Sequence, residues 1–261
     1  MKSFRISSCA LLAGMLLPAQ LTVPRAGIAR YPDGSIHIIH GISANLIVDS
    51  GVLGNAESAS FSDSTGLLAE SGLIRSLRAD GTVLGAYHSD DPLPLLQVNT
   101  AWLPTKHLLL LWDGTKFVET PIDDSSFEGK VTFLSLPATN VAQFYVTRAD
   151  SSVARFTVSL PSGLVVSSDT QPAAHDWLFI QQGWTLTAAD HGLTAENAKG
   201  STQTITLSKQ PLPPGDLVLE QMSNHWLHIS SRSTRAAWAL YLDQSKVNVS
   251  VLPPPAPENA R

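Results

Sequence analysis

The chain has 261 residues, a net charge of −5, and 15% charged against 43% hydrophobic residues. This composition supports a sizeable hydrophobic core and argues against an intrinsically disordered chain. Lys and Arg form no basic run, which disfavours nucleic acid and anionic membrane surfaces as partners.

The N-terminus has the pattern of a secretory signal peptide. Lys2 and Arg5 precede an apolar run over residues 9–17, and Pro18-Ala19-Gln20 follows as a break with a small residue. The run is about half the roughly 20 residues that a spanning helix needs. We therefore expect a signal peptide over residues 1–19, a secreted or periplasmic protein, and no transmembrane anchor after cleavage.

Cleavage would also remove the chain's single cysteine, Cys9. The mature chain would then have no thiol for a disulfide, for catalysis or for a metal site. Ala29 is a second candidate for the residue before the cleavage point, so two mature N-termini stay open.

From residue 27 onward, short apolar or alternating runs are separated by Gly, Pro, Asp, Asn and Ser. Residues 61–87 show this best, with three strand-like runs joined by turns, and we interpret them as most of one antiparallel blade. Residues 188–199 also fit a short helix. The expected strands are 27–31, 35–40, 45–49, 67–70, 73–78, 82–87, 95–103, 107–112, 117–120, 130–136, 141–148, 153–160, 164–168, 176–181, 184–188, 202–208, 217–221, 225–230, 236–242 and 246–252.

Tight turns recur along the chain at an average spacing of roughly 42 residues, which is typical of propeller blades. They are expected at Asp33-Gly34, Asp80-Gly81, Asp113-Gly114, Asp150-Ser151, Asp190-His191 and Asp243-Gln244. Where Asp-Gly joins two β-rich runs, we expect a type I′ turn with positive φ at both central residues.

The spacing predicts an all-β fold, a β-propeller of four-stranded antiparallel blades. Six blades are expected, with five to seven compatible with the spacing. We expect one propeller domain over residues 20–252 and a disordered Pro-rich tail over residues 253–261. Either C-terminal strands complete the first blade or that blade is short, and we favour closure by the termini because it removes exposed edge strands. Two β-sandwiches in tandem are the alternative.

Two segments carry a resemblance to known propeller families. Residues 61–69, F-S-D-S-T-G-L-L-A, resemble the turn and strand of WD40-like and TolB-like repeats, and residues 31–36, Y-P-D-G-S-I, are similar to the hairpin of NHL-type blades. The whole chain resembles secreted bacterial β-propeller proteins. It departs from the WD40 pattern because Trp112-Asp113 enters a hairpin turn instead of ending a strand. The resemblance implies a fold and carries over no catalytic residue.

Two matching histidine pairs, His37/His40 and His225/His228, raise the question of a metal site. Residues three apart on a strand point to opposite faces, so neither pair can chelate an ion by itself. A shared site would need one histidine from each pair, such as His37 and His225. We therefore assign no metal ligand and expect ordinary strand or rim histidines.

Candidate ligand residues are loop acids and one tryptophan. Asp90-Asp91 and Asp123-Asp124 lie in predicted loops, where propellers display binding residues, and solvated loop acids are the simpler interpretation. Among the six tryptophans, only Trp184 follows a turn glycine and is expected to be exposed, where an indole ring can stack on a sugar. No nucleophile elbow or phosphate loop is present, so we assign no catalytic residue and no cofactor.

The sequence therefore favours a secreted or periplasmic propeller that acts as a non-enzymatic binding module. The expected partner is another envelope or extracellular protein, or a saccharide. The alternative is a carbohydrate-active hydrolase or lyase with its site at the propeller mouth.

Overall fold

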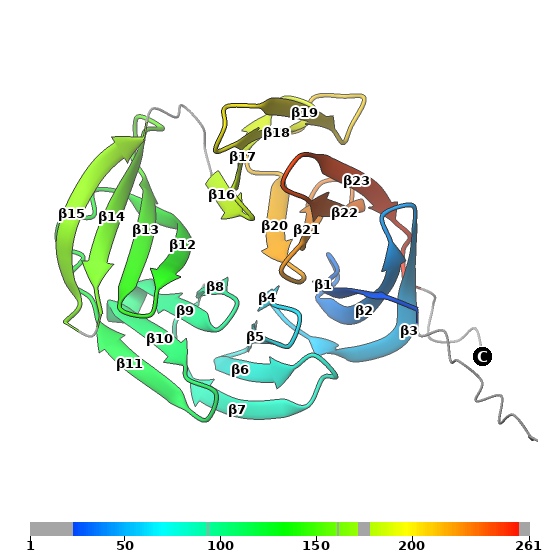
Figure 1. The fold of residues 1–261 in the computed structure, drawn as a ribbon. Helices are drawn as coiled ribbons and strands as arrows, with labels where there is room; N and C mark the ends of the chain where they lie inside the picture. Colours follow the sequence, from blue (N-terminus) through cyan, green and yellow to red (C-terminus); the bar gives the residue numbers. More distant parts are fainter. Residues whose placement is uncertain (1–22, 93, 161, 172–177, 256–261) are drawn as a thin grey trace, which may run out of the picture.

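The computed structural model describes residues 23–92, 94–160, 162–171 and 178–255, and these residues form an all-β propeller. Six antiparallel sheets surround a central axis (Figure 1), so the predicted fold class is confirmed. Residues 1–19, expected to be a signal peptide, and residues 256–261 of the expected tail lie outside the described part. Within it, no helix has the length and apolar character needed to cross a membrane.

Each blade is built from consecutive strands, in order from the axis outward. Blade 1 contains β1 (Arg25–Arg30), β2 (Ser35–Ile42) and β3 (Asn45–Asn55). Blade 2 contains β4 (Ser58–Phe61), β5 (Thr65–Glu70), β6 (Leu73–Arg78) and β7 (Val83–His88). Blade 3 contains β8 (Leu95–Gln97), β9 (Thr100–Leu103), β10 (Leu108–Trp112) and β11 (Phe117–Pro121), with the 3₁₀ helix η1 (Pro104–Lys106).

The last three blades follow the same plan. Blade 4 contains β12 (Lys130–Ala138), β13 (Val141–Thr147), β14 (Val153–Ser159) and β15 (Leu164–Gln171). Blade 5 contains β16 (Leu178–Gln181), β17 (Trp184–Ala189), β18 (Gly192–Asn197) and β19 (Thr202–Thr206). Blade 6 contains β20 (Leu217–Gln221), β21 (Trp226–Ser231), β22 (Ala237–Leu242) and β23 (Val247–Leu252).

Many middle strands are buried on both faces because neighbouring blades cover both. β10 reads L-L-L-L-W and β22 reads A-W-A-L-Y-L, and nearly every residue of both strands is buried. The apolar clusters cross from blade to blade; one joins Tyr31 and Ile39 of blade 1 to Trp226 of blade 6. The hydrophobic core therefore lies mainly between blades. Burying each such side chain stabilises the fold by about 1.5–3 kcal/mol.

The predicted Asp-Gly turns exist, but their expected geometry is wrong. Gly34, Gly81 and Gly114 have φ of 89°, 88° and 100°, while the aspartates before them have no positive φ. Each aspartate instead accepts a hydrogen bond from the backbone N–H two residues on, as Asp80 does from Thr82 at 2.9 Å. The aspartate thus closes an Asx turn.

Two-residue loops with positive φ at both positions do occur elsewhere. Ser71-Gly72 has φ of 35° and 84°, and Gln182-Gly183 has 53° and 76°, values that fit a type I′ turn. Gln182-Gly183 joins the predicted strands 176–181 and 184–188.

Two further expectations are corrected. Residues 95–103, predicted as one strand, form the hairpin β8–β9 with Val98 at φ 51° in its turn. The predicted short helix over residues 188–199 is wrong, because β18 pairs with β17 and β19 there. Extended pairing between neighbours overrides the local helical pattern.

The two ends of the propeller differ in what they carry. The turns that follow the inner strands lie together at one end, since Asn224 binds Asp63 and Gln181 binds the carbonyls of Ser223 and Asn224. The second turn of each blade and the connections between blades therefore lie at the opposite end, which we call the connection end. It includes residues 71–72, 104–107, 148–152 and 190–191.

Blade 1 differs from the other blades in topology, because its first strand, β1, does not occupy the position of an innermost strand such as β4 or β20. The Tyr31 hydroxyl at the end of β1 donates to the Pro253 carbonyl at 3.0 Å, and the Ala56 N–H donates to the Gly34 carbonyl. These contacts place the end of β1 at the connection end, opposite to the ends of β4 and β20. β3 then lies beside the outer strand β23 (Figure 1). Within the described residues, blade 1 therefore has only the three outer strands.

The expected closure by exchange of C-terminal strands is accordingly wrong. β23 pairs within blade 6, and the ring closes through contacts between this blade and blade 1, which has three strands in the described residues. The Ile28 N–H donates to the Met222 carbonyl at 3.2 Å, and the Ser223 hydroxyl donates to the Ala26 carbonyl at 2.8 Å. We call this contact between blades 1 and 6 the seam.

Candidate functional site

The two predicted pairs of loop acids both split, with one member exposed and the other turned inward. Asp90 has a side chain 97% exposed, with the Lys106 Nζ 3.8 Å away, and Asp123 is an exposed cap of Ser125. Asp91 is 6% exposed, and the side chain of Asp124 is 21% exposed. The split follows from the hydrogen bonds, because Asp91 and Asp124 reach Thr105 and His107, whereas Asp123 turns back onto its own loop at Ser125.

Asp91 and Asp124, 33 positions apart in the sequence, line one pocket of about 460 Å³ between blades 3 and 4 at the connection end. Its wall is largely apolar, and Thr105 and Lys130 add polar groups. We call it the blade 3–4 pocket. The pocket is lined by Asp91, Pro92, Leu95, Trp102, Pro104, Thr105, Asp124, Phe127, Gly129, Lys130 and Val131.

The two acids have different environments. The Asp91 carboxylate accepts hydrogen bonds from the backbone N–H and the hydroxyl of Thr105, at 2.8 and 2.7 Å. Asp91 therefore fixes the connection between blades 2 and 3 against η1. Asp124 lies 2.8 Å from the Nδ1 of His107, whose left-handed φ of 52° ends η1 and aims the ring outward.

The aromatic wall was not predicted as a site. Trp102 packs edge-on against Phe144, with ring centroids 5.1 Å apart, and Phe127 lies 4.6 Å from Phe156. Trp102 is 2% exposed, and its Nε1–H has no hydrogen-bond partner among the described residues. An unpaired buried N–H costs about 1–3 kcal/mol. No sequence pattern indicates this site, because Trp102 lies in an ordinary apolar strand.

Trp184, predicted to be exposed, is buried at 2% exposure. It faces blade 6, and its Nε1–H donates to the Asp243 carbonyl at 2.6 Å. The neighbouring turn glycine does not expose the ring, because β17 alternates and the face carrying Trp184 and Leu186 belongs to the core. The indole joins blades 5 and 6.

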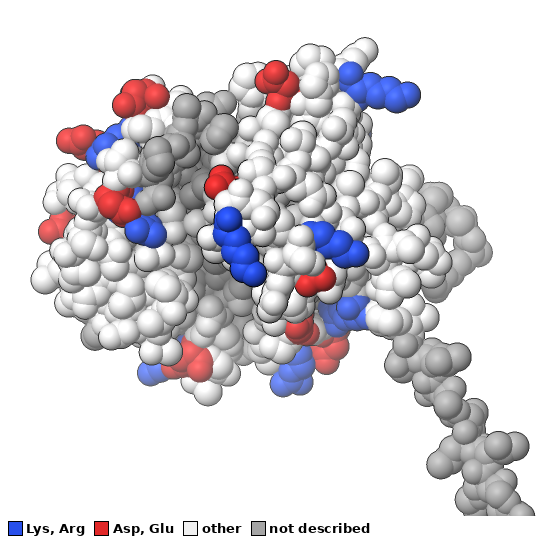
Figure 2. All heavy atoms as spheres, turned by 45° about the horizontal axis from the view of Figure 1, so that its top comes forward, with Lys and Arg blue, Asp and Glu red and all other residues white. Residues whose placement is uncertain are grey.

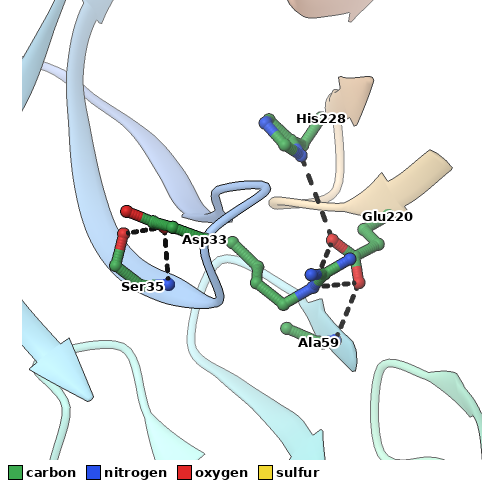
Figure 3. Close-up of polar contacts among 6 residues, drawn as sticks. Asp33, Ser35, Ala59, Glu220 and His228 are labelled. Atoms are coloured by element: carbon green, nitrogen blue, oxygen red, sulfur yellow. Dashed lines mark hydrogen bonds and ion pairs between the residues drawn. The ribbon is translucent and has the colours of Figure 1, made fainter. Parts of the chain in front are cut away.

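A second polar cluster fills the space beside the axis where blade 1 lacks an inner strand. Figure 3 shows the Glu220 carboxylate between the Ala59 N–H and His228. The Arg30 Nε donates to both carboxylate oxygens of Glu220, at 2.8 and 3.1 Å. The inner strands β4 and β20 thus meet directly through Ala59 and Glu220. This cluster fills the protein interior rather than lining a pocket.

Burial controls the charges of this cluster. Burial raises the pKa of Glu220, and the nearby Arg30 guanidinium only partly offsets this effect. Burial, with a contribution from Arg30, lowers the pKa of His228 to about 3. His228 is therefore neutral near pH 7, and its 3.9 Å approach to Glu220 is not a salt bridge. Both His228 ring nitrogens lack a hydrogen-bond partner in the described structure.

The seam brings together one histidine from each predicted pair, but not as metal ligands. The Tyr31 ring lies between His37 and His228, with centroid distances of 5.3 and 5.7 Å. His225 instead lies 3.3 Å from the Leu242 carbonyl. The described residues contain no group of three or more His, Cys, Asp or Glu that could hold a metal ion.

A serine and a histidine also meet beside the seam. The Ser35 hydroxyl lies 3.0 Å from the His37 Nε2. It lies 2.6 Å from the Asp33 carboxylate, as Figure 3 shows. A hydroxyl has one hydrogen, and the shorter contact to Asp33 directs it away from His37. Hydrogen bonds from Ser35 also lower the pKa of Asp33, although burial opposes this. The group closes a turn and is not an activated nucleophile.

Charges on the face drawn in Figure 2 are scattered and of both signs, with no basic patch. No protein-family model matches the sequence, and no curated protein matches it.

Solved structures with a similar fold share little sequence with the chain. Hsv2 of Kluyvelomyces marxianus is 7% identical with a TM-score of 0.40, covering 84% of this chain and 81% of that one. BBS1N, solved in complex with ARL6DN, is 11% identical with a TM-score of 0.43, covering 87% and 76%. SapL1 lectin, solved with alpha methyl fucoside, is 12% identical with a TM-score of 0.46, covering 90% and 98%. These values assign the chain to no family.

Proposed function

We propose that the protein is a non-enzymatic binding module and that a saccharide binds in the blade 3–4 pocket. The observation that carries this proposal is the composition of the pocket, which places Asp124 and Lys130 at the rim of a largely apolar hollow. Ligand sites are typically concave and mostly apolar, with a few placed polar groups.

The chemistry of a sugar ring fits this arrangement. One face of the ring presents C–H groups that can pack on Phe127, Pro92 and Pro104, and its hydroxyls can donate to Asp124 and accept from Lys130. The pocket has room for one or two sugar units at about 460 Å³. Asp91 supports this site by holding Thr105 in place.

The test compares adjacent acids, of which Asp124 lines the pocket and Asp123 is exposed and caps Ser125. Asp124→Asn should weaken binding of the best ligand from a saccharide panel by about tenfold, or about 1.4 kcal/mol. Asp123→Asn, on the exposed neighbour, should leave the affinity within about twofold. Isothermal titration calorimetry measures both. Equal affinities of the two variants for that ligand would contradict the proposal.

The alternative of a carbohydrate-active hydrolase or lyase at the propeller mouth has less support. At the level of Ala59 and Glu220 the inner strands meet, and the Gln97 side chain donates to Gln221 at 3.0 Å. Protein atoms therefore occupy this part of the axis. The enzyme alternative predicts new reducing or unsaturated ends when the protein is incubated with the panel, and the binding proposal predicts none.

We also propose that the protein acts outside the cytoplasm, on the strength of residues 1–19. Expression of the full chain in a bacterial host, followed by mass spectrometry of the periplasmic fraction, tests export. A mature N-terminus at Gln20 would support it, and a full-length product confined to the cytoplasm would contradict it.

A further inference from the structure

A second hollow lies on blade 5, at the connection end, and has a different chemistry from the blade 3–4 pocket. Its volume is about 600 Å³, and all of its lining comes from the end of β17, the turn after it, β18, β19 and the residues that follow β19. We call it the blade 5 hollow. It is lined by Ala189, Asp190, His191, Gly192, Thr194, Thr204, Ile205, Thr206, Ser208 and Lys209.

The strand register explains why this part of blade 5 is hollow. Ala189, Gly192 and Thr206 lie opposite one another across β17, β18 and β19, so two of the three residues in this row are small. A Cβ atom at Gly192 would lie 2.2 Å from the Ile205 carbonyl oxygen. The small side chains form the floor, and the larger residues around them form the walls.

The register also places hydroxyls side by side on this face. Thr187, Thr194 and Thr204 form the next row across the three strands. The hydroxyls of Thr194, Thr204 and Thr206 make no hydrogen bond to another part of the described chain. Valine has the same shape and suits a strand equally well, so the strands alone do not require these hydroxyls. They are available to a ligand.

The threonine face is turned away from blade 6. The opposite face of blade 5 carries Trp184 and Leu186, and Gln203 on that side donates to the Val247 carbonyl of blade 6 at 2.7 Å. The threonine face therefore faces the blade 4 side of the ring.

The outer part of the facing surface of blade 4 is polar as well, whereas Phe133, Tyr145 and Val153 on the same face belong to an apolar cluster. Ala142 and Phe144 of β13 pack toward Trp102 of blade 3, so the alternate residues of β13 face blade 5. On that side, Arg155 holds Asp169 through two bonds of 2.9 and 2.8 Å, and the Tyr145 hydroxyl donates to Gln143 at 3.3 Å. Apolar contact between the two blades is found where Phe133 meets Phe179, at 5.0 Å.

From this arrangement we infer a second binding site, centred on the blade 5 hollow, for a neutral polyhydroxylated chain such as an uncharged glycan. Asp190 and Lys209 have opposite charges, so the lining has no net charge that would select an ion. Threonine and serine hydroxyls donate and accept hydrogen bonds, as sugar hydroxyls do. The hollow and the blade 3–4 pocket open at the same end, on either side of blade 4.

The test uses neutral hexasaccharides as probes: cellohexaose, xylohexaose, maltohexaose and laminarihexaose, each titrated calorimetrically into the full chain. Thr194→Val with Thr204→Val removes two hydroxyls without changing the strand shape, and should weaken binding of the best probe by about tenfold. Thr202→Val is the matched control, because Thr202 lies on the same strand and face but does not line the hollow. It should leave the affinity within about twofold.

A second double variant distinguishes binding at the blade 5 hollow from binding at the blade 3–4 pocket. Asp124→Asn with Lys130→Gln alters the blade 3–4 pocket and should leave binding at the hollow unchanged. Absence of binding by all four neutral probes, equal affinity of the Thr194/Thr204 variant and the unmodified chain, or an equal loss in Thr202→Val would each overturn the second site. Loss only in the Asp124/Lys130 variant would assign the binding to the blade 3–4 pocket alone and would also overturn it. Preference for hexagalacturonate over the neutral probes would overturn the neutral specificity.

Discussion

Replacing Arg30 with alanine should open the seam, because it leaves the Glu220 carboxylate buried without its cation. The Arg30 and Glu220 side chains are 13% and 9% exposed, and among the described residues Glu220 then keeps only the Ala59 N–H, at 3.1 Å, as a donor. Removing one partner of a buried ion pair costs about 3–5 kcal/mol. In a chain of this size each kcal/mol lowers Tm by about 2–4 °C, so we expect a fall of roughly 6–20 °C.

The loss should depend on pH with a defined sign. Burial already raises the pKa of Glu220, and removing Arg30 takes away the charge that opposes this. When the pKa of a glutamate is higher in the folded than in the unfolded state, its contribution to stability is fully present below the pKa of the unfolded state, about 4.3. This contribution is lost as the pH rises through the pKa of the folded state. The deficit of Arg30→Ala should therefore be largest at neutral pH and shrink toward pH 4.5.

Urea denaturation followed by tryptophan fluorescence, at several pH values, measures the free energy of unfolding. Arg30→Met with Glu220→Gln is the control, because it removes both charges and keeps an acceptor for the Ala59 N–H. It should recover most of the loss. A change in Tm of less than about 1 °C for Arg30→Ala at pH 7 would show that the seam does not depend on this pair.

Two further predictions concern buried and crowded positions. Because the pKa of His228 is lowered to about 3, the free energy of unfolding should fall by about 2 kcal/mol between pH 7 and pH 5 through this residue alone. In urea titrations, His228→Leu should lack this part of the decline. An unchanged dependence of the free energy of unfolding on pH would contradict the prediction. Gly163→Ala should lower Tm far more than Gly200→Ala, because a Cβ at Gly163 would lie 1.8 Å from the Pro121 carbonyl oxygen, whereas the space at Gly200 is open. Both glycines have positive φ, so the backbone strain of an alanine is similar at the two positions. Equal losses of Tm would therefore refute the steric argument.

The blade count was predictable because turn residues carry local information. The side chains of Asp33, Asp80 and Asp113 each close a turn without help from distant residues. The turns are not equivalent, because Asp33-Gly34 joins the first two strands of blade 1 whereas the other two join the last two strands of blades 2 and 3, so their spacing only approximates the length of a blade. The type of turn was harder to predict. A positive φ at Ser71 or Gln182 depends on the pairing of the flanking strands, and a serine or glutamine residue does not by itself predict it.

The candidate site was only partly predictable because side-chain direction comes from neighbouring strands. The sequence singled out Asp90-Asp91 and Asp123-Asp124, but which member of each pair turns inward depends on η1 and on Thr105. The burial of Trp184 follows from the packing of blade 6 against blade 5. The sequence indicated that the first blade needs a further strand, but the direction of β1 depends on contacts that the sequence does not reveal, such as those of Arg30 with Glu220 and of Tyr31 with Pro253.

The seam also sets the order in which the chain can fold. Blades 2 to 6 pair strands that follow one another in the sequence, whereas Arg30 pairs with Glu220, 190 positions later. Contacts so distant in sequence form slowly, because the intervening loop must be closed first. Until blade 6 is in place, the apolar side of blade 1 that packs against Trp226 and Met222 has no partner. The last blade to be made therefore closes the ring and covers the first.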